Sequence, residues 1–357
     1  MKQVSGNNQK YQVIGLMSGT SLDGLDLAAC EFTKEPEGWS FRFLATDTLI
    51  YSPEWREKLA VAPILPGREL ILLDRQYGKF LGESVSQFIR KFNLNAEVIA
   101  SHGHTVFHAP GMGITHQIGH PSNLAAATGL PVVADFRTTD VALGGQGAPL
   151  VPAGDRHLFG QYTYCLNLGG FANISFEHLG DRMAGDICPV NLVANALAGK
   201  AGELYDDQGN TGRRGNLLPG LLRELNELPF YRTPFPRSLG REWVEEQVFP
   251  LLKKYEGKIP DLLRTWYEHV ACQISAVLKE QGTVLVTGGG AYNRFLLERM
   301  EQMSHATLVL PDDQVIQYKE ALIFAFLGLL RLQNEKNCYR SATGASRDSS
   351  CGSVYLP

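Results

Sequence analysis

The sequence predicts an α/β protein of two lobes that repeat one order of elements, βββαβαβα, with a cleft between the lobes. Three observations lead to this prediction. Strand-like apolar runs joined by short turns open the chain between residues 13 and 51, and a similar set begins again near Tyr162. In each half, helical and strand-like segments then alternate. The repetition lies in the order of elements and not in the residues, and such a duplicated fold favours a ligand site where its lobes meet.

The elements of the first half follow from apolar periodicity and from their end signals. Ser52 and Pro53 open a helix in the manner of a cap followed by a first-turn proline, and Gly129 ends another. Strands are expected at 13–17, 25–32, 41–51, 98–100 and 131–134, and helices from 52, at 68–90 and at 124–128.

The second half repeats this pattern. Strands are expected at 162–168, 171–176, 283–287 and 307–310, with a short one ending at 185, and helices at 189–200, 260–281, 293–303 and 319–332. We therefore place the first lobe at 1–140 and the second at 141–357. The tail at 339–357 is rich in Ser, Thr and Gly, which is compatible with a final coil that returns to the first lobe or with a loose end.

Composition narrows the class of function. With 357 residues, of which 44% are apolar, the chain is long enough for two cores. A net charge of −4 without a basic stripe gives no reason to expect a nucleic-acid partner. The chain has no apolar run of the ~18 residues that a membrane span needs, and its N-terminus lacks the apolar core of a signal peptide. The six cysteines are scattered without a C-x-x-C motif, so we expect free thiols and a soluble, cytoplasmic protein.

The first candidate site is the turn between the two opening strands. It contains two glycines, three hydroxyls and two carboxylates, and glycines let backbone N–H groups approach an anion closely. The alternative is an ordinary polar hairpin, and it has equal weight. On the functional interpretation, Asp23 and Asp26 hold Mg²⁺ through water. The residues expected to contact phosphate are Gly19, Thr20, Ser21, Leu22, Asp23, Gly24, Leu25 and Asp26.

Two more glycine turns lie in the second half. Gly169 and Gly170 join two strands as the counterpart of the opening turn, either as a second phosphate loop or as a tight hairpin. Gly288, Gly289 and Gly290 end a buried strand before a helix. Three adjacent glycines exceed what a turn requires and would let a nucleobase or ribose lie against the backbone, whereas a plain strand-to-helix turn is the alternative.

Asp186 is the candidate general base. It follows the short strand that ends at Gly185, where its carboxylate can face a ligand and accept a proton at pH 7. The alternative, of equal weight, is a cap for the helix that Pro189 begins.

Polar residues around a Gly- and Pro-rich loop at 144–152 are candidates for ligand recognition. An arginine with nearby acids suits a hydroxylated or carboxylated ligand, and a surface loop with a local ion pair is the alternative. These candidate substrate-binding residues are Asp135, Arg137, Asp140 and Gln146. Five histidines between 102 and 120 also include an H-x-H-x-x-x-H spacing that could bind zinc. Because no cysteine accompanies them, hydrogen bonding is the favoured interpretation.

Together these motifs resemble the anhydro-N-acetylmuramic acid kinase family of the sugar kinase/Hsp70/actin superfamily. The resemblance covers nearly the whole chain, in the family's order. The motifs that carry it are G-L-M-S-G-T-S-L-D-G-L-D at 15–26, S-H-G-H-T-V-F-H at 101–108, Q-I-G at 117–119, D-F-R-T-T-D-V-A-L-G-G-Q-G-A-P-L-V-P at 135–152, N-L-G-G-F-A-N-I-S at 167–175, Y-D-D-Q-G-N-T-G-R-R-G at 205–215, S-L-G-R-E at 238–242 and V-T-G-G-G-A-Y-N at 286–293.

The resemblance implies an actin-like ATPase (ribonuclease H-like) fold and a phosphotransferase with an alcohol acceptor. The implied substrates are ATP with Mg²⁺ and the cell-wall sugar 1,6-anhydro-N-acetylmuramic acid. Asp186 would take a proton from the water that opens the anhydro bridge, and O6 would receive the γ-phosphoryl group. The resemblance also implies a homodimer in peptidoglycan recycling. The alternatives are a kinase of another sugar and a nucleotide switch of the Hsp70 or actin type.

Two positions depart from the family pattern. After Asp186 the family has T-G-P-G-N, whereas this chain has I-C-P-V-N and so lacks both glycines. The family motif S-H-G-Q-T becomes S-H-G-H-T, in which His104 replaces an amide and introduces a group that can titrate.

Overall fold

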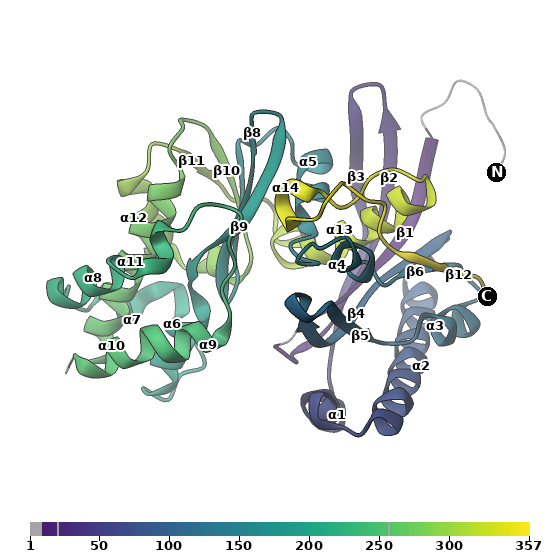
Figure 1. Ribbon diagram of the computed structural model, residues 1–357, viewed down its shortest axis with the longest axis horizontal. Coiled ribbons are helices and arrows are strands. Elements are labelled where there is room, and N and C mark those ends of the chain that lie inside the picture. Colours follow the sequence, from purple (N-terminus) through teal and green to yellow (C-terminus); the bar gives the residue numbers. More distant parts are fainter. Residues whose placement is uncertain (1–8, 20, 256–257) are drawn as a thin grey trace. The chain divides into compact units, whose positions relative to one another are not determined.

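The chain divides into two compact units, as seen in a computed structural model that describes residues 9–19, 21–255 and 258–357 (Figure 1). The first unit comprises Met1–Leu158 and Tyr318–Pro357, and the second comprises Phe159–Gln317. This division falls 18 residues after the boundary drawn at 140 and assigns the last 40 residues to the first unit. The cleft expected between the lobes stays a prediction.

The first unit is built on a mixed sheet in the strand order β12-β6-β4-β1-β2-β3. The first three strands form an antiparallel meander, whereas β4 and β6 run parallel to β1 and to β4 respectively. A further strand, β5, pairs antiparallel with β4. The strands are β1 (Gln9–Ser18), β2 (Gly24–Glu35), β3 (Gly38–Ile50), β4 (Val98–Ala109), β5 (Ile114–Ile118), β6 (Val132–Ala134) and β12 (Ser353–Tyr355).

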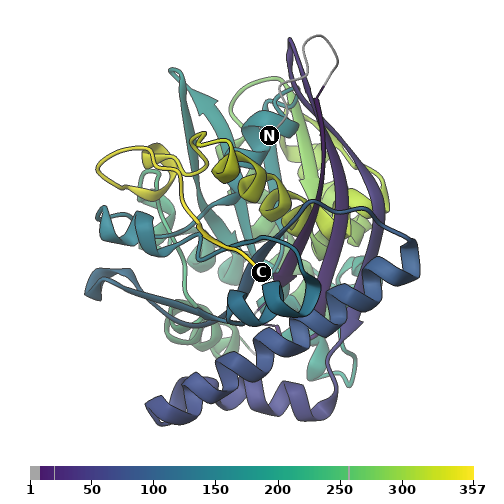
Figure 2. The same ribbon diagram turned by 90° about the vertical axis from the view of Figure 1, so that its right-hand side faces the viewer.

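Helices cover both faces of this sheet. On one face, Ile14 and Leu16 of β1 share a buried core with Tyr77 of α2, the long blue helix at the bottom of Figure 2. On the other face, β1 lies directly on α13, because a Cβ added at Gly15 would fall 1.9 Å from the carbonyl oxygen of Ala321. The helices are α1 (Pro53–Val61), α2 (Gly67–Phe92), α3 (Pro121–Thr128), α4 (Thr138–Ala142), α5 (Val151–Leu158), α13 (Asp313–Leu332) and α14 (Arg340–Thr343).

The sheet of the second unit has the order β11-β10-β7-β8-β9. When β5 and β12 are left aside, the strands of both units therefore lie in the order third, second, first, fourth, fifth. Within each sheet the first three strands are antiparallel, and the fourth runs parallel to the first. This is the duplicated, ribonuclease H-like arrangement of actin-type ATPases, and it confirms the predicted fold class. The strands are β7 (Tyr164–Leu168), β8 (Phe171–His178), β9 (Asp181–Pro189), β10 (Thr283–Thr287) and β11 (Thr307–Val309).

Several helices of the second unit pack against α11, whose Trp266 is fully buried in the core and donates its indole N–H to the carbonyl of Val190 at 3.1 Å. The helices of this unit are α6 (Asn191–Gly199), α7 (Asn210–Arg213), α8 (Pro219–Asn226), α9 (Arg241–Trp243), α10 (Phe249–Lys254), α11 (Ile259–Val277) and α12 (Arg294–Met303). Among the residues that the structure describes, none of the helices is at once long and apolar enough to span a bilayer.

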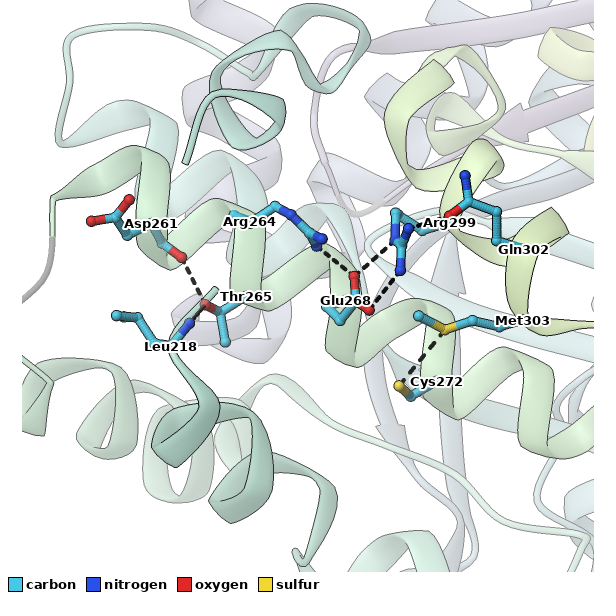
Figure 3. A network of polar contacts seen from close by, with 9 residues as sticks. All are labelled: Leu218, Asp261, Arg264, Thr265, Glu268, Cys272, Arg299, Gln302 and Met303. Atoms are coloured by element: carbon cyan, nitrogen blue, oxygen red, sulfur yellow. Dashed lines mark hydrogen bonds and ion pairs between the residues drawn. The ribbon is translucent and has the colours of Figure 1, made fainter. Parts of the chain in front are cut away.

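Charged side chains fix α12 to α11 (Figure 3). Glu268 of α11 accepts hydrogen bonds from Arg299 of α12 at 2.8 Å on each carboxylate oxygen, and from Arg264 one turn away. Thr265 adds a tie to the start of α8, because its hydroxyl accepts from the backbone N–H of Leu218 at 3.0 Å. A bidentate arginine–carboxylate pair has a defined geometry, so this network sets the position of α12.

Several predicted boundaries were wrong. The strand expected at 98–100 continues to Ala109, because its polar residues pair with β5, which apolar periodicity does not reveal. The strand expected to end at 185 continues to Pro189, and the helix expected from 189 begins at Asn191. The tail returns to the first unit, as one of the two expectations had it, and it contains α14 and β12, of which β12 pairs with β6.

Candidate active site

A row of polar residues crosses the sheet of the second unit. Thr287, Asn167, Asn173 and Asp186 lie opposite one another on β10, β7, β8 and β9 in turn. Directly opposed residues project from the same face of a sheet. Since the intervening residues, such as Leu166, belong to the buried core, this row lies on the opposite face. The fold thus gathers amide and carboxylate groups in one line.

Asp186 lies within β9 and does not cap a helix. Helix α6 begins at Asn191 without a side-chain cap, and the Asp186 carboxylate instead accepts the backbone N–H of Leu239 at 2.8 Å. The ladder with β8 shifts next to Asp186 and leaves Ile187 as an extra residue. Such a bulge re-aims neighbouring side chains, and bulges are frequent near active sites.

The surroundings of Asp186 tune its acidity. Burial raises the pKa of its carboxyl to about 6, while the Leu239 N–H and the Arg237 charge act in the opposite direction. Desolvation is the dominant cause, because the charged form is the one that loses water. At pH 7 most of the group is ionised, and a base with a pKa near the working pH transfers protons efficiently.

The Gly169–Gly170 turn is held by the start of α6. The backbone N–H of Val190 donates to the carbonyl of Gly170 at 2.8 Å, and the amide of Asn191 donates to the carbonyl of Leu168 at 3.0 Å. A Cβ added at Gly170 would meet no atom closer than 4.0 Å, so there is open space beside the turn. The backbone here is fixed and approachable, as a phosphate-binding turn requires.

The three glycines after β10 have different roles. Gly288 has a φ of +80° and packs so tightly that a Cβ would lie 2.5 Å from the Asn167 side chain. A Cβ at Gly290 would lie 2.6 Å from that of Leu168. By contrast, a Cβ at Gly289 would meet only Asn191, at 3.8 Å. Gly288 and Gly290 are therefore needed for packing, and Gly289 leaves room for a ligand.

That room belongs to a cavity of about 800 Å³ within the second unit, large enough for a nucleoside. Of the described residues that the sequence predicted to bind the nucleotide, Gly289 alone lines it. Several other residues that line the cavity belong to the motifs at 205–215 and 286–293, which could have identified them from the sequence. The lining residues include Asn191, Asn195, Tyr205, Gln208, Tyr292 and Asn293.

One wall of this cavity is an irregular segment organised by Asp206. Its buried carboxylate accepts the backbone N–H groups of Thr211 at 2.7 Å and Gly212 at 2.9 Å, and the hydroxyl of Tyr267 at 3.2 Å. Asn293 caps α12 by accepting from Leu296 at 3.0 Å on the same rim. Helix α12 and the segment are both anchored, so the cavity is preorganised.

In the first unit, local contacts constrain the described residues of the turn between β1 and β2. The Ser21 hydroxyl donates to Asp23 at 2.8 Å, and Leu22 has a φ of 59°. A Cβ at Gly24 would lie 2.8 Å from the carbonyl oxygen of Leu49, so no larger residue fits there. Leu25 is buried in the core and can offer a ligand only its backbone. Gly19 lies in the described part of the turn, whereas Thr20 lies outside the described residues.

Asp26 stands at the base of this turn. It accepts the Thr48 hydroxyl at 2.7 Å, and burial raises the pKa of its carboxyl, with a smaller contribution from Asp23. Within 9–19, 21–255 and 258–357, no group of three or more His, Cys, Asp and Glu side chains is placed to hold a metal ion. The donors near the turn are oxygen atoms, which suits Mg²⁺ held through water and phosphate.

A buried hydrogen-bonded chain supports the same turn. His104 Nδ1 lies 3.0 Å from the Ser18 hydroxyl, which accepts the Tyr51 hydroxyl at 2.7 Å, and Tyr51 in turn bonds Tyr77. Burial lowers the pKa of His104 to about 4, so the ring is neutral at pH 7. The residue that departs from the family motif therefore acts as a hydrogen-bonding group in this pH range.

We expect His104→Gln to retain most stability at pH 7 and His104→Leu to lose about 1–3 kcal/mol, because leucine removes the partner that His104 offers to the buried Ser18 hydroxyl. The pH dependence follows from the low pKa of His104 in the folded protein. Below the pKa of about 6.5 that this histidine has in the unfolded chain, the unfolded state binds a proton that the folded state does not, and this lowers the stability of the folded protein. The wild type should thus lose about 2 kcal/mol more than His104→Gln between pH 7 and pH 5. Urea unfolding at both pH values measures this, and equal losses would contradict the assignment.

The predicted substrate residues of the first unit fall into two groups. Asp135, which has a φ of 58°, lines a cavity of about 180 Å³ together with His102, Gln117 and Thr138. Arg137 adjoins it and donates two hydrogen bonds to His102 Nε2, at 3.1 and 2.8 Å, and one to the carbonyl of Gly147. Burial lowers the pKa of Arg137 to about 10, which leaves it charged at neutral pH.

Asp140 and Gln146 are placed differently. Asp140 is buried, and its oxygens accept the Gly147 N–H at 2.8 Å and the Thr343 hydroxyl at 2.7 Å. Gln146 is exposed, and its backbone N–H donates to the carbonyl of Thr343 at 2.8 Å. Both residues tie the loop at 143–147 to the tail, a contact that the sequence did not reveal.

Sequence comparisons with known proteins identify the family of this chain. A model of the anhydro-N-acetylmuramic acid kinase family matches residues 11–357. The chain is 35% identical to a protein of that name from Mannheimia succiniciproducens, over 97% of this chain and 99% of the relative. It is 36% identical to another from Pseudomonas putida, over 96% and 98%. The chain belongs to the anhydro-N-acetylmuramic acid kinase family.

Proposed function

We propose that this chain uses ATP to convert 1,6-anhydro-N-acetylmuramic acid into N-acetylmuramic acid 6-phosphate and ADP, in peptidoglycan recycling. Family membership supplies the reaction. The observation that carries its assignment to this site is Asp186, with a pKa of about 6, in a polar row beside a glycine turn and a nucleoside-sized cavity.

Asp186 is the proposed general base. Its carboxylate accepts a proton from a water molecule, whose oxygen forms a bond to the anomeric carbon as the bond from that carbon to O6 breaks. The released O6 then forms a bond to the γ-phosphorus of ATP, ADP leaves, and Asp186 returns the proton to solvent. The protein contributes by positioning these groups and by stabilising charge.

We propose that the nucleotide contacts three parts of the chain. The cavity of the second unit would take adenosine, with Gly289 against the ring, and the Gly169–Gly170 turn would contact phosphate. The turn at 18–24 of the first unit is a second proposed phosphate contact. Asp23 and Asp26 would hold Mg²⁺ through water, and the ion would neutralise the phosphate charge.

For the sugar, we propose direct contacts from Asp135 and Arg137, which lie at and beside the cavity of the first unit. Asp140 and Gln146 would serve the same site through the loop that they hold. We further propose that the chain works in the cytoplasm as a homodimer, which rests on the family resemblance.

The proposal is tested by ADP release with ATP, Mg²⁺ and one of three sugars: the anhydro sugar, N-acetylmuramic acid or glucose. Release with the anhydro sugar alone is the expected result. Release with N-acetylmuramic acid or glucose would indicate a kinase of a free hydroxyl. Nucleotide binding without turnover of any sugar would indicate a nucleotide switch of the actin or Hsp70 type.

A further inference from the structure

We propose that Arg237 is a positioning residue that fixes the Asp186 carboxylate through the segment 237–239. This inference rests on the proposed function, in which Asp186 is the base. Two hydrogen bonds to the main chain of Asp186 join the residues across 51 positions of sequence: Asp186 N–H donates to the carbonyl of Arg237, and the side-chain Nε of Arg237 donates to the carbonyl of Asp186, both at 2.9 Å. Two residues later, Leu239 N–H binds the carboxylate itself at 2.8 Å.

The guanidinium of Arg237 is fixed on its other side. It lies 4.9 Å from the ring centre of Phe230 and 4.7 Å from that of Phe235, so it contacts two aromatic rings. Its Nη1 donates to the carbonyl of Thr233 at 2.8 Å. A guanidinium that combines ring contacts with directed donors holds one orientation, which a lysine cannot reproduce.

Close packing sets the segment against β9. A Cβ added at Gly185 would lie 2.6 Å from the Phe235 ring and 2.8 Å from the carbonyl oxygen of Arg237. The segment thus fits over the residue before Asp186, where only glycine leaves room. Because the bulge at Ile187 interrupts the ladder on the β8 side, the segment supplies the fixed partner on the other side.

The positive charge of Arg237 also lowers the pKa of Asp186. Burial keeps Cys188 and Tyr231 protonated by raising the pKa of each, and it lowers the pKa of His269, which bonds Tyr231, to about 3. These neighbours are neutral between pH 5 and 8. Loss of the Arg237 charge therefore removes an effect that favours the ionised carboxylate, and the acidic limb of the rate profile should move to higher pH.

The test compares Arg237→Met and Arg237→Lys with Arg241→Met, which removes an exposed arginine four residues away that pairs with Glu245. We expect Arg237→Met to lower kcat by ~10- to 100-fold, with little change in the KM for ATP, since small displacements of a catalytic group cost this much. The acidic limb of the rate profile of this variant should move to higher pH by about one unit. Arg237→Lys should keep the limb near its wild-type position while recovering only part of kcat, and Arg241→Met should resemble the wild type.

A measurement without substrate separates this inference from the proposed function. The pKa of Asp186 is measured by carbon NMR of the ¹³C-labelled carboxyl, which is assigned with Asp186→Asn. A higher pKa in Arg237→Met than in the wild type supports the positioning role even if the wild type turns over no sugar. An unchanged pKa and an unchanged rate profile in Arg237→Met would overturn it. If that variant fails to fold, Arg237→Lys decides, since wild-type kcat there would contradict the need for a planar, fixed guanidinium.

Discussion

Replacement of Asp186 with asparagine is expected to lower kcat by about 10²–10⁴-fold, which is the usual contribution of a general base. The amide keeps the shape of the side chain and can still accept the Leu239 N–H, but it cannot take a proton from water. The KM for ATP should change little, because the nucleotide cavity is lined by other residues. Steady-state kinetics with the anhydro sugar measure both quantities.

The matched control is Asp181→Asn, at the exposed start of the same strand. It changes the same charge without touching the polar row, so kcat should stay near the wild-type value. Activity of Asp186→Asn close to that of Asp181→Asn would remove Asp186 from the mechanism.

The second large effect is expected at Gly289. A leucine here would project into the cavity of about 800 Å³ and compete with the nucleotide for space. Forcing a ligand against extra methylenes costs ~1–3 kcal/mol, so the Kd for ATP should rise ~10- to 100-fold. Isothermal titration with a non-hydrolysable ATP analogue measures this change.

Two further variants show whether the effect is local. Gly289→Ala should keep the fold intact, because its Cβ meets no protein atom closer than 3.8 Å, and the shorter side chain should weaken ATP binding less than leucine does. Gly290→Ala should instead lower stability, since its Cβ would overlap Leu168 at 2.6 Å. Unchanged ATP affinity in Gly289→Leu would place the nucleotide elsewhere.

The elements that could be predicted were those with strong apolar periodicity. The runs that became β1, β2, β7 and β10 and the long helix α2 were predicted because their buried residues recur at the strand or helix period. The hairpin of β4 and β5 was missed, since its histidines and glutamine are polar and their pairing comes from the backbone. The return of α13 and the tail to the first unit depends on packing across more than 150 residues, as at Gly15 and Ala321.

At the site, too, single residues could be predicted from the sequence, whereas the contacts between distant residues could not. Asp186 was singled out by its place near the end of a strand, but its hydrogen bonds to Arg237 and Leu239 join positions more than 50 residues apart. A run of three glycines pointed to a ligand loop, whereas the φ of Gly288 and the packing of Gly290 could be known only from the structure. Asp140 looked like a ligand contact because it precedes a Gly-rich loop, and only the fold shows that it binds that loop.

The central claim is that Asp186 directs water to the anomeric carbon, and ¹⁸O-labelled water tests it most directly. A brief turnover of the anhydro sugar with ATP in H₂¹⁸O should place the label at C1 of the sugar 6-phosphate and none in its phosphate. The control incubates the unlabelled sugar 6-phosphate in the same water for the same time, which corrects for exchange at the anomeric position. Label at C1 above this control is the predicted result. Label no higher than the control, with the phosphorylated product present, would contradict hydrolytic ring opening at this site.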